Sequence, residues 1–407
     1  MARHAVTTPG RSRWFFLVMA ATAACVVATT LSMTGLSYVN VDSLLRDTRS
    51  FYAFLVAPAV LVIMAVVLAT LPRVAISLAV FVGVLLLAEA GAWTLRARTP
   101  PNRGEPEAIG APTFYVPDKA LGYAQAPSTV ARHRRSVGET QIYDVIYRTD
   151  RWGRRETPTT VGPPRTSFLL FFGDSNMFGE GLSQTETLPY YAGELAAAYR
   201  PYNYGVSGYG PAQVLALGRL LHLPREIPEH DGYAIYFFIP AHVGRVIGSS
   251  SVSAGWGRHF PYYAMDERGE LVERGDFVHG RPWTTLAYYF WTKSNLIDYL
   301  RIDLPLRHTV HDYALTAKVL KESGRVLAEQ MHLRGFIVVL GQAYNTTQRQ
   351  VIRSVREALI REDVASLDYT ELFDMDDPQY RLSDYHNSAR TNRAIAARLV
   401  ADLGLAR

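Results

Sequence analysis

The sequence is short of cysteine and of charge. Cys25 is the single cysteine among 407 residues, and it lies within an apolar run. One thiol excludes a disulfide framework and a cysteine-based zinc site within the chain. Charged residues make up 19% of the chain and hydrophobic residues 48%, which is too apolar for a disordered chain. The chain also lacks a glycine-rich phosphate loop with a lysine, which disfavours nucleotide hydrolysis.

The excess of positive charge is confined to one part of the chain. The net charge is +5, yet residues 1–104 carry nine arginines, no lysine and three acids. The remaining residues are therefore close to neutral, and the arginines flank apolar segments. This distribution does not indicate a nucleic-acid-binding face, and we expect no nucleic-acid partner.

Three apolar runs dominate residues 1–96, which we interpret as a membrane anchor. A bilayer core is crossed by about 20 apolar helical residues. The runs predict three transmembrane helices, near 14–36, 51–71 and 74–95, with the lipid bilayer as a partner. A cleaved signal peptide is the alternative for the first run, but two further runs follow it. Glu89 indicates either a polar intramembrane site or a carboxylate near the interface or facing a neighbouring helix.

Basic residues around the first run predict the orientation. Arg3, Arg11 and Arg13 precede this run, which favours a cytoplasmic N-terminus. Three crossings then place everything after residue 96 on the extracytoplasmic side, periplasmic or external. Arg46 and Arg49 in the first loop argue in the opposite direction.

A linker and a β-rich preamble are expected over 97–165. Residues 97–112 are rich in proline, glycine and charge, as is typical of a linker. Thr140–Arg148 alternates apolar and polar residues like a strand, and Asp150–Gly153 predicts a turn.

Residues 166–407 alternate between strand-like and helix-like segments, which predicts an α/β fold with a parallel sheet between two helical layers. The expected strands are Ser167–Phe172, Tyr202–Tyr204, Tyr233–Ile239, Gly335–Leu340 and Val364–Leu367. The expected helices are Leu188–Tyr199, Pro211–Leu223, Thr309–Leu333, Thr347–Arg361 and Thr391–Leu403. The glycine- and aromatic-rich insertion 245–300 interrupts the alternation. Within it Tyr262–Phe277 predicts a hairpin, and the insertion is long enough to form a lid or a substrate wall.

The first motif is Gly173-Asp174-Ser175, directly after the apolar strand Ser167–Phe172. A serine at this point lies at the carboxyl edge of the sheet, where the chemistry of such folds gathers. A serine that only caps the following helix is the alternative interpretation.

The second motif is the glycine loop 203–211, with the sequence NYGVSGYGP. Its glycines permit positive φ and a close approach of a ligand to backbone N–H groups, as an oxyanion hole requires. A plain connection between strand and helix explains the glycines equally well.

The third motif is Asp384-Tyr385-His386, just before the last predicted helix. A histidine held by a nearby carboxylate can act as a general base. Taken alone, a surface histidine is the simpler interpretation, since the chain holds 11 histidines.

In this order the three motifs resemble the SGNH/GDSL hydrolase superfamily, over roughly residues 165–405. The stretch from Tyr147 to Arg154 is similar to that of membrane-anchored members. The resemblance implies a flavodoxin-like SGNH domain in which Ser175 is the nucleophile and His386 the base. It also implies that Asp384 orients His386, and that the N–H groups of Ser175 and Gly208 line the oxyanion hole.

The chain departs from the family pattern after the strand Tyr233–Ile239. The family has an asparagine there that completes the oxyanion hole, whereas this chain has Pro240-Ala241-His242. His242 is the candidate replacement donor. Loss of one such donor costs about 10²–10³ in rate if nothing replaces it. The family more commonly has Asp-x-x-His, with one more residue between the two side chains than in this chain. With that spacing, the position of the aspartate is occupied here by Ser383.

Two further groups have residue types that can bind a ligand. Arg245 is a candidate for holding an anionic or sugar substrate, with a plain surface arginine as the alternative. His308, His311 and Asp312 have a metal-like spacing, but no third strong ligand is evident and an exposed helical turn is the better interpretation. We expect no metal and no cofactor.

The sequence therefore predicts a membrane-anchored serine esterase acting on acyl or acetyl esters of envelope carbohydrate or lipid. Two alternatives stay open. One is an O-acyltransferase that passes the acyl group to an envelope polysaccharide. The other is an inactive SGNH-like binding module, which would explain the missing asparagine after Tyr233–Ile239.

Overall fold

A computed structural model describes residues 72–98, 107–109, 114–137, 139–160 and 164–406. The chain divides into two compact units, one formed by Met1–Arg98 with Lys293–Leu300 and the other by Thr99–Thr292 with Arg301–Arg407. The spans predicted near 14–36 and 51–71 lie outside the described residues.

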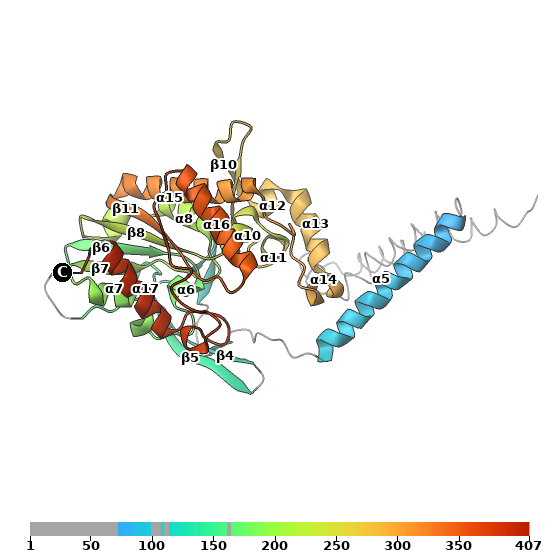
Figure 1. Cartoon of the computed structure of the whole chain (residues 1–407), viewed down its shortest axis with the longest axis horizontal. Coiled ribbons are helices and arrows are strands. Elements are labelled where there is room, and N and C mark those ends of the chain that lie inside the picture. Colours follow the sequence, from blue (N-terminus) through green and yellow to red (C-terminus); the bar gives the residue numbers. More distant parts are fainter. Residues whose placement is uncertain (1–71, 99–106, 110–113, 138, 161–163, 407) are drawn as a thin grey trace, which may run out of the picture. The chain divides into compact units, whose positions relative to one another are not determined.

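A sheet of five parallel strands forms the centre of the larger unit (Figure 1). The strands are β6 (Ser167–Phe172), β7 (Tyr199–Asn203), β8 (Asp231–Phe238), β11 (His332–Leu340) and β12 (Ser366–Asp368). Their spatial order is β12-β11-β8-β6-β7, the flavodoxin-like order in which the first two strands are exchanged. The prediction of an α/β fold with a parallel sheet is confirmed.

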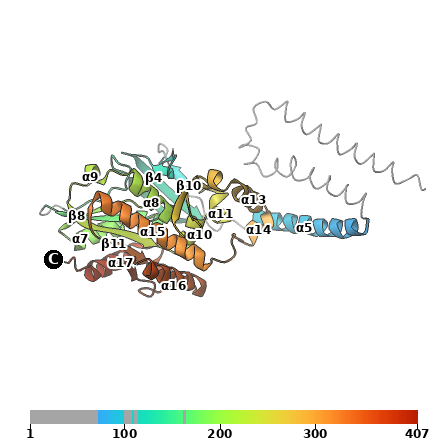
Figure 2. The same cartoon turned by 90° about the horizontal axis from the view of Figure 1, so that it is seen from above.

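Helices pack on both faces of this sheet (Figures 1 and 2). One face carries α8 (Pro211–Leu220), α15 (Val310–Gln330) and α16 (Thr346–Arg361). The other face carries α7 (Leu188–Leu195) and α17 (Ala389–Asp402). Strand β6 is apolar throughout because its side chains alternate between two cores. Phe168, Leu170 and Phe172 point into the first core, and Leu169 and Phe171 into the second.

The preamble folds into antiparallel strands. β4 (Val130–Val137) pairs with β5 (Thr140–Arg148) and with β1 (Glu107–Ile109). A second pair is formed by β2 (Tyr115–Asp118) and β3 (Gly122–Gln125). The predicted strand Thr140–Arg148 is present with the expected bounds.

The insertion contains the predicted hairpin, formed by β9 (Pro261–Met265) and β10 (Leu271–Asp276). Its turn is closed by the N–H of Gly269, which donates to the carbonyl of Asp266 at 2.9 Å. Tyr263 packs against α8 and α15, so the hairpin lies on the outside of a helical layer. Short helices precede and follow the hairpin in the chain: α10 (Ala241–Ile247), α11 (Ser250–Ser253), α12 (Phe277–Gly280) and α13 (Pro282–Thr292). A further short helix, α9 (Leu223–Glu226), lies between α8 and β8 in the chain.

The smaller unit contains α5 (Pro72–Arg98) and α14 (Asn295–Tyr299). Glu89 of α5 accepts the backbone N–H of Asn295 at 2.7 Å and the hydroxyl of Ser294. Glu89 thus faces a neighbouring helix, one of the two interpretations left open above. The third predicted span is helical, as expected. In the part of the chain that the structure describes, however, no helix has both the length and the apolarity needed to cross a membrane.

Candidate active site

Ser175 is the first residue of the short helix α6 (Ser175–Phe178), directly after β6. It lies where the strand order reverses between β6 and β8, the usual place for ligands in such sheets. Gly173 makes the turn with φ 157°, and a Cβ there would lie 2.9 Å from Cβ of Met177. The Asp174 carboxylate accepts the N–H of Asn176 at 3.0 Å and so caps the helix. The serine is thereby presented at the edge of the sheet.

His386 and Asp384 lie beside this serine. His386 Nε2 is 2.9 Å from Ser175 Oγ, although the two residues are 211 positions apart. On the other side of the ring, Nδ1 is 3.0 Å from Asp384 Oδ2, without the alignment of a well-formed hydrogen bond. The structure therefore brings together the three residues predicted to form a catalytic triad, in the expected order.

The charge around His386 favours its protonated form. Burial lowers the pKa of the imidazole, but the Asp384, Glu180 and Asp174 carboxylates outweigh this effect and raise it above its usual value. Burial raises the pKa of Asp384, while His386 and Arg135 bring it below its usual range. Asp384 is therefore ionised at neutral pH and stabilises an imidazolium.

Arg135 and Glu180 complete this cluster, and neither residue was predicted from the sequence. Arg135 of β4 donates to Asp384 Oδ2 at 2.9 Å and lies 3.6 Å from Glu180 Oε1. Glu180 Oε2 is 3.8 Å from His386 Nε2. The preamble therefore contributes a charge to the site. Glu180 lies only five positions after Ser175, which is the one signal in the sequence that points to it.

Hydrogen bonds of Asn176 connect the turn that carries Ser175 with the loop that carries His386. Its side-chain oxygen accepts the backbone N–H of Asn387 at 3.1 Å and the amide of Gln342 at 2.8 Å. Gln342 also donates to the side chain of Asn387. These side chains are buried, so the bonds fix the position of His386 relative to Ser175.

Gly208, predicted to line the oxyanion hole, lies in the loop that follows β7. Its φ is +89°, and a Cβ there would lie 2.3 Å from the hydroxyl of Tyr123 and 2.9 Å from the Trp256 ring. The Tyr123 hydroxyl donates to the carbonyl of Ser207 at 2.6 Å. Only glycine fits at position 208, in keeping with the positive φ predicted for this loop. The insertion 245–300 contributes Trp256 beside the loop. The β9–β10 hairpin does not form a lid here.

His242 and Arg245 occupy positions that were not expected. His242 is fully buried, with Nδ1 2.7 Å from the Tyr236 hydroxyl and Nε2 3.3 Å from Asp174. Burial lowers the pKa of His242 to about 4 despite the Asp174 carboxylate. Both ring nitrogens face these partners, so the geometry does not favour the predicted role of His242 as an oxyanion donor.

Arg245 is engaged by Asp174 as well. Its guanidinium donates to Asp174 Oδ2 at 3.0 Å and to the carbonyl of Tyr209 at 2.6 Å. Arg245 thus connects the turn before Ser175 with the glycine loop 203–211, and its charge is neutralised by Asp174. A contact between Arg245 and substrate, predicted from the sequence, is not needed to account for its position.

One group among the described residues has the composition of a metal site. The ligand atoms of Glu180, Asp384 and His386 lie within 4.8 Å of one another. The guanidinium of Arg135 already supplies positive charge there, so this cluster fits an ion-pair network better than a metal. The predicted alternative for Asp312 is supported, since it caps the start of α15 by accepting the N–H of Thr309 at 2.7 Å.

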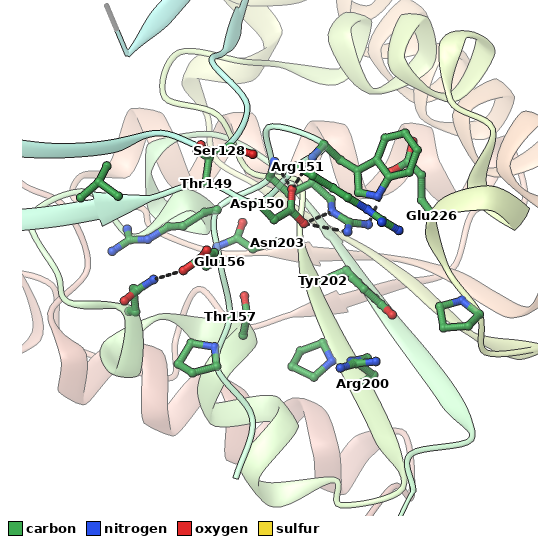
Figure 3. Close-up of a pocket in the computed structure, with 18 residues that line it drawn as sticks. Ser128, Thr149, Asp150, Arg151, Glu156, Thr157, Arg200, Tyr202, Asn203 and Glu226 are labelled. Carbon is green, nitrogen blue, oxygen red and sulfur yellow. Dashed lines mark hydrogen bonds and ion pairs between the residues drawn. The ribbon is translucent and has the colours of Figure 1, made fainter. Parts of the chain in front are cut away.

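A separate polar cavity of about 790 Å³ lies between the end of the preamble and β7 (Figure 3). Asp150, Arg151, Arg200 and Tyr202 are among its lining residues, and Ser175 and His386 are not. Arg155, also in the lining, donates to the carbonyls of Phe178, Gly179 and Leu182 at 2.7, 2.6 and 2.5 Å. It thereby holds the segment that carries Glu180.

No family model and no curated protein matches the chain. Among solved structures, it is similar to a lipolytic G-D-S-L protein from Veillonella parvula, with 11% identity, 58% of this chain and 97% of that one covered, and a TM-score of 0.34. It is also similar to an acetyl xylan esterase from Butyrivibrio proteoclasticus, with 10% identity, 69% and 73% covered, and a TM-score of 0.35. A carbohydrate esterase family 2 enzyme from Corynascus thermopiles gives 13% identity, 75% and 88% covered, and a TM-score of 0.34. Likenesses at this level do not assign an activity.

Proposed function

We propose that the chain is a serine esterase of the SGNH type, with Ser175 as nucleophile, His386 as general base and Asp384 as the residue that orients it. The observation that carries the proposal is the 2.9 Å contact between Ser175 Oγ and His386 Nε2, with Asp384 3.0 Å from Nδ1. A serine at the start of a helix needs neither a histidine beside its hydroxyl nor a buried carboxylate on the far side of that histidine.

The geometry supports an acyl-enzyme mechanism. His386 Nε2 takes the proton of Ser175 as Oγ attacks the ester carbonyl, and the N–H groups of Ser175 and Gly208 stabilise the oxyanion. Collapse of the tetrahedral intermediate expels the alcohol, which receives the proton from His386. Water then attacks the acyl group on Oγ, and His386 serves again as base and acid.

We further propose that the esterase is attached to a membrane and acts on acyl or acetyl esters of envelope carbohydrate or lipid. The apolar runs near 14–36 and 51–71 support the attachment. The arginines that precede the first run support an extracytoplasmic catalytic unit. This part of the proposal depends on the sequence alone.

The full-length protein in detergent micelles tests the esterase proposal. It is treated with a fluorophosphonate probe and assayed on p-nitrophenyl acetate, beside the variants Ser175→Ala and His386→Ala. Loss of either residue of such a pair lowers turnover by about 10⁴-fold or more. Ser128→Ala is the matched control, because Ser128 lines the separate cavity. Absence of labelling in the folded wild type, or equal labelling of Ser175→Ala, would reject the proposal in favour of a binding module.

A further inference from the structure

Glu180 is a carboxylate held at the reacting face of His386. Its two oxygens have different neighbours. Oε1 accepts the hydroxyl of Tyr143 at 3.2 Å and faces Arg135. Oε2 accepts the hydroxyl of Ser207 at 2.8 Å and lies 3.8 Å from His386 Nε2. These contacts come from the preamble and from the glycine loop, so the carboxylate is fixed from two sides.

The position of Glu180 is not explained by the formation of the acyl-enzyme. Asp384 already orients His386 through Nδ1. Glu180 lies instead near Nε2, the atom that exchanges protons with Ser175 and with the attacking nucleophile. A carboxylate placed there is suited to act on the nucleophile that follows the serine.

The distance between Nε2 and Oε2 suits one bridging water. A water oxygen about 2.8 Å from each atom would see them at roughly a right angle, near the angle between its own O–H bonds. Such a water donates one proton to Nε2 and the other to Oε2. Its lone pairs then point away from both groups and are available to attack.

We propose that Glu180 is a positioning residue for the water that resolves the acyl-enzyme, an inference that rests on the proposed esterase function. The water oxygen bonds to the acyl carbon while its proton passes to Nε2 of His386. Its second O–H bond stays intact and is held by Oε2 of Glu180. When the intermediate collapses, the bond from the acyl carbon to Ser175 Oγ breaks and Oγ recovers the proton from Nε2. A carboxylic acid leaves.

This arrangement separates water from a simple alcohol. Water has two protons and can satisfy both groups, whereas methanol has one proton, which the base must take. Loss of the Glu180 carboxylate should therefore slow hydrolysis of the acyl-enzyme more than its methanolysis. A residue that only stabilised the fold or the triad would affect both reactions equally.

The test measures how the acetyl-enzyme partitions between water and methanol. The full-length protein is given p-nitrophenyl acetate with added methanol, and methyl acetate and acetate are quantified for wild type and Glu180→Gln. The rate of fluorophosphonate labelling reports the serine step separately. Glu357→Gln is the matched control, because Glu357 lies exposed on α16, where it pairs with Arg361 at 3.4 Å.

For Glu180→Gln we expect labelling within about twofold of wild type, hydrolysis slower by about tenfold, and a severalfold rise in the ratio of methyl acetate to acetate. An unchanged ratio overturns the inference. If Glu180→Gln does not fold, Tyr143→Phe removes a donor to Oε1 and must raise the ratio to a smaller extent, and no rise overturns the inference equally. Failure of the wild type to label at Ser175 would refute the esterase proposal itself, a result distinct from both.

Discussion

Replacing Arg135 tests whether the preamble is part of the catalytic apparatus. Arg135 and Asp384 form an ion pair at 2.9 Å whose side chains are only 11% and 1% exposed. Arg135→Met keeps most of the volume and removes the charge. Asp384 then retains only His386 as a charged partner, so its position and its ionisation both become less well defined.

The expected cost is that of one buried charge-assisted hydrogen bond, about 1.5–3 kcal/mol. It stays below the 3–5 kcal/mol of a buried charge left without any partner, because His386 still faces Asp384. At about 2–4 °C per kcal/mol, the melting temperature should fall by roughly 3–12 °C. If the whole effect is felt in the transition state, kcat/KM falls by about 10- to 100-fold as an upper limit.

The neighbouring arginine on the same strand is the control. Arg134 pairs with Asp144 at 3.0 Å with 39% of its side chain exposed, and such pairs contribute about 0–1 kcal/mol. The assays are thermal unfolding and kcat/KM on p-nitrophenyl acetate for Arg135→Met and Arg134→Met. Because the pKa of Asp384 is lowered in the folded protein, its stabilisation is present above the unfolded value of about 3.9. It disappears as the pH falls through the folded pKa, so the difference in melting temperature should shrink in acid. Equal behaviour of the two variants at pH 7 would refute the reasoning.

Two further predictions follow from the same site. Burial lowers the pKa of His386, but Asp384 and Glu180 raise it overall. Because the base must be neutral to act, kcat/KM should reach half its maximum above pH 6.5. In Glu180→Gln this midpoint should lie at a lower pH than in the wild type. A series of kcat/KM measurements from pH 5 to 9 checks this, and a midpoint below 6.5 in the wild type would contradict it. Gly208→Ala should lower both kcat/KM and the melting temperature more than Gly269→Ala, since a Cβ at Gly208 would lie 2.3 Å from the Tyr123 hydroxyl whereas one at Gly269 meets nothing within 4 Å. At either position the positive φ costs about 1–3 kcal/mol, so equal effects in unfolding and turnover assays would show that the contact is unimportant.

The sequence predicted the fold because its strongest signals are local. Ser167–Phe172 is wholly apolar and is a strand with those bounds, since helices cover both of its faces. The hairpin around Gly269 follows from turn residues between two short runs. Ser175 and His386 were paired through the resemblance in the order of the three motifs, and the fold agrees, because loops that follow parallel strands meet at one edge of the sheet.

The remaining features depend on side-chain direction across distant segments. Arg135 lies 249 positions before Asp384, and a strand pattern does not show which loop a side chain on β4 will meet. His242 was predicted as an oxyanion donor in place of the missing asparagine, yet its ring turns inward to Tyr236 and Asp174. The insertion 245–300 was expected to form a lid or a substrate wall, but the apolar face of its hairpin packs on α8 and α15.

The contacts made by Arg155 set the limits of any smaller catalytic fragment. A cut at residue 166, where the alternation of strands and helices begins, would remove this guanidinium from the carbonyls of Phe178, Gly179 and Leu182. It would also remove Arg135 from Asp384. A shorter chain made for crystallisation, display or directed evolution therefore has to keep β4 and β5. When the unit that carries Ser175 is exchanged between related chains, the junction should be placed before residue 114. The exchanged segment then includes β4 and β5 together with Ser175.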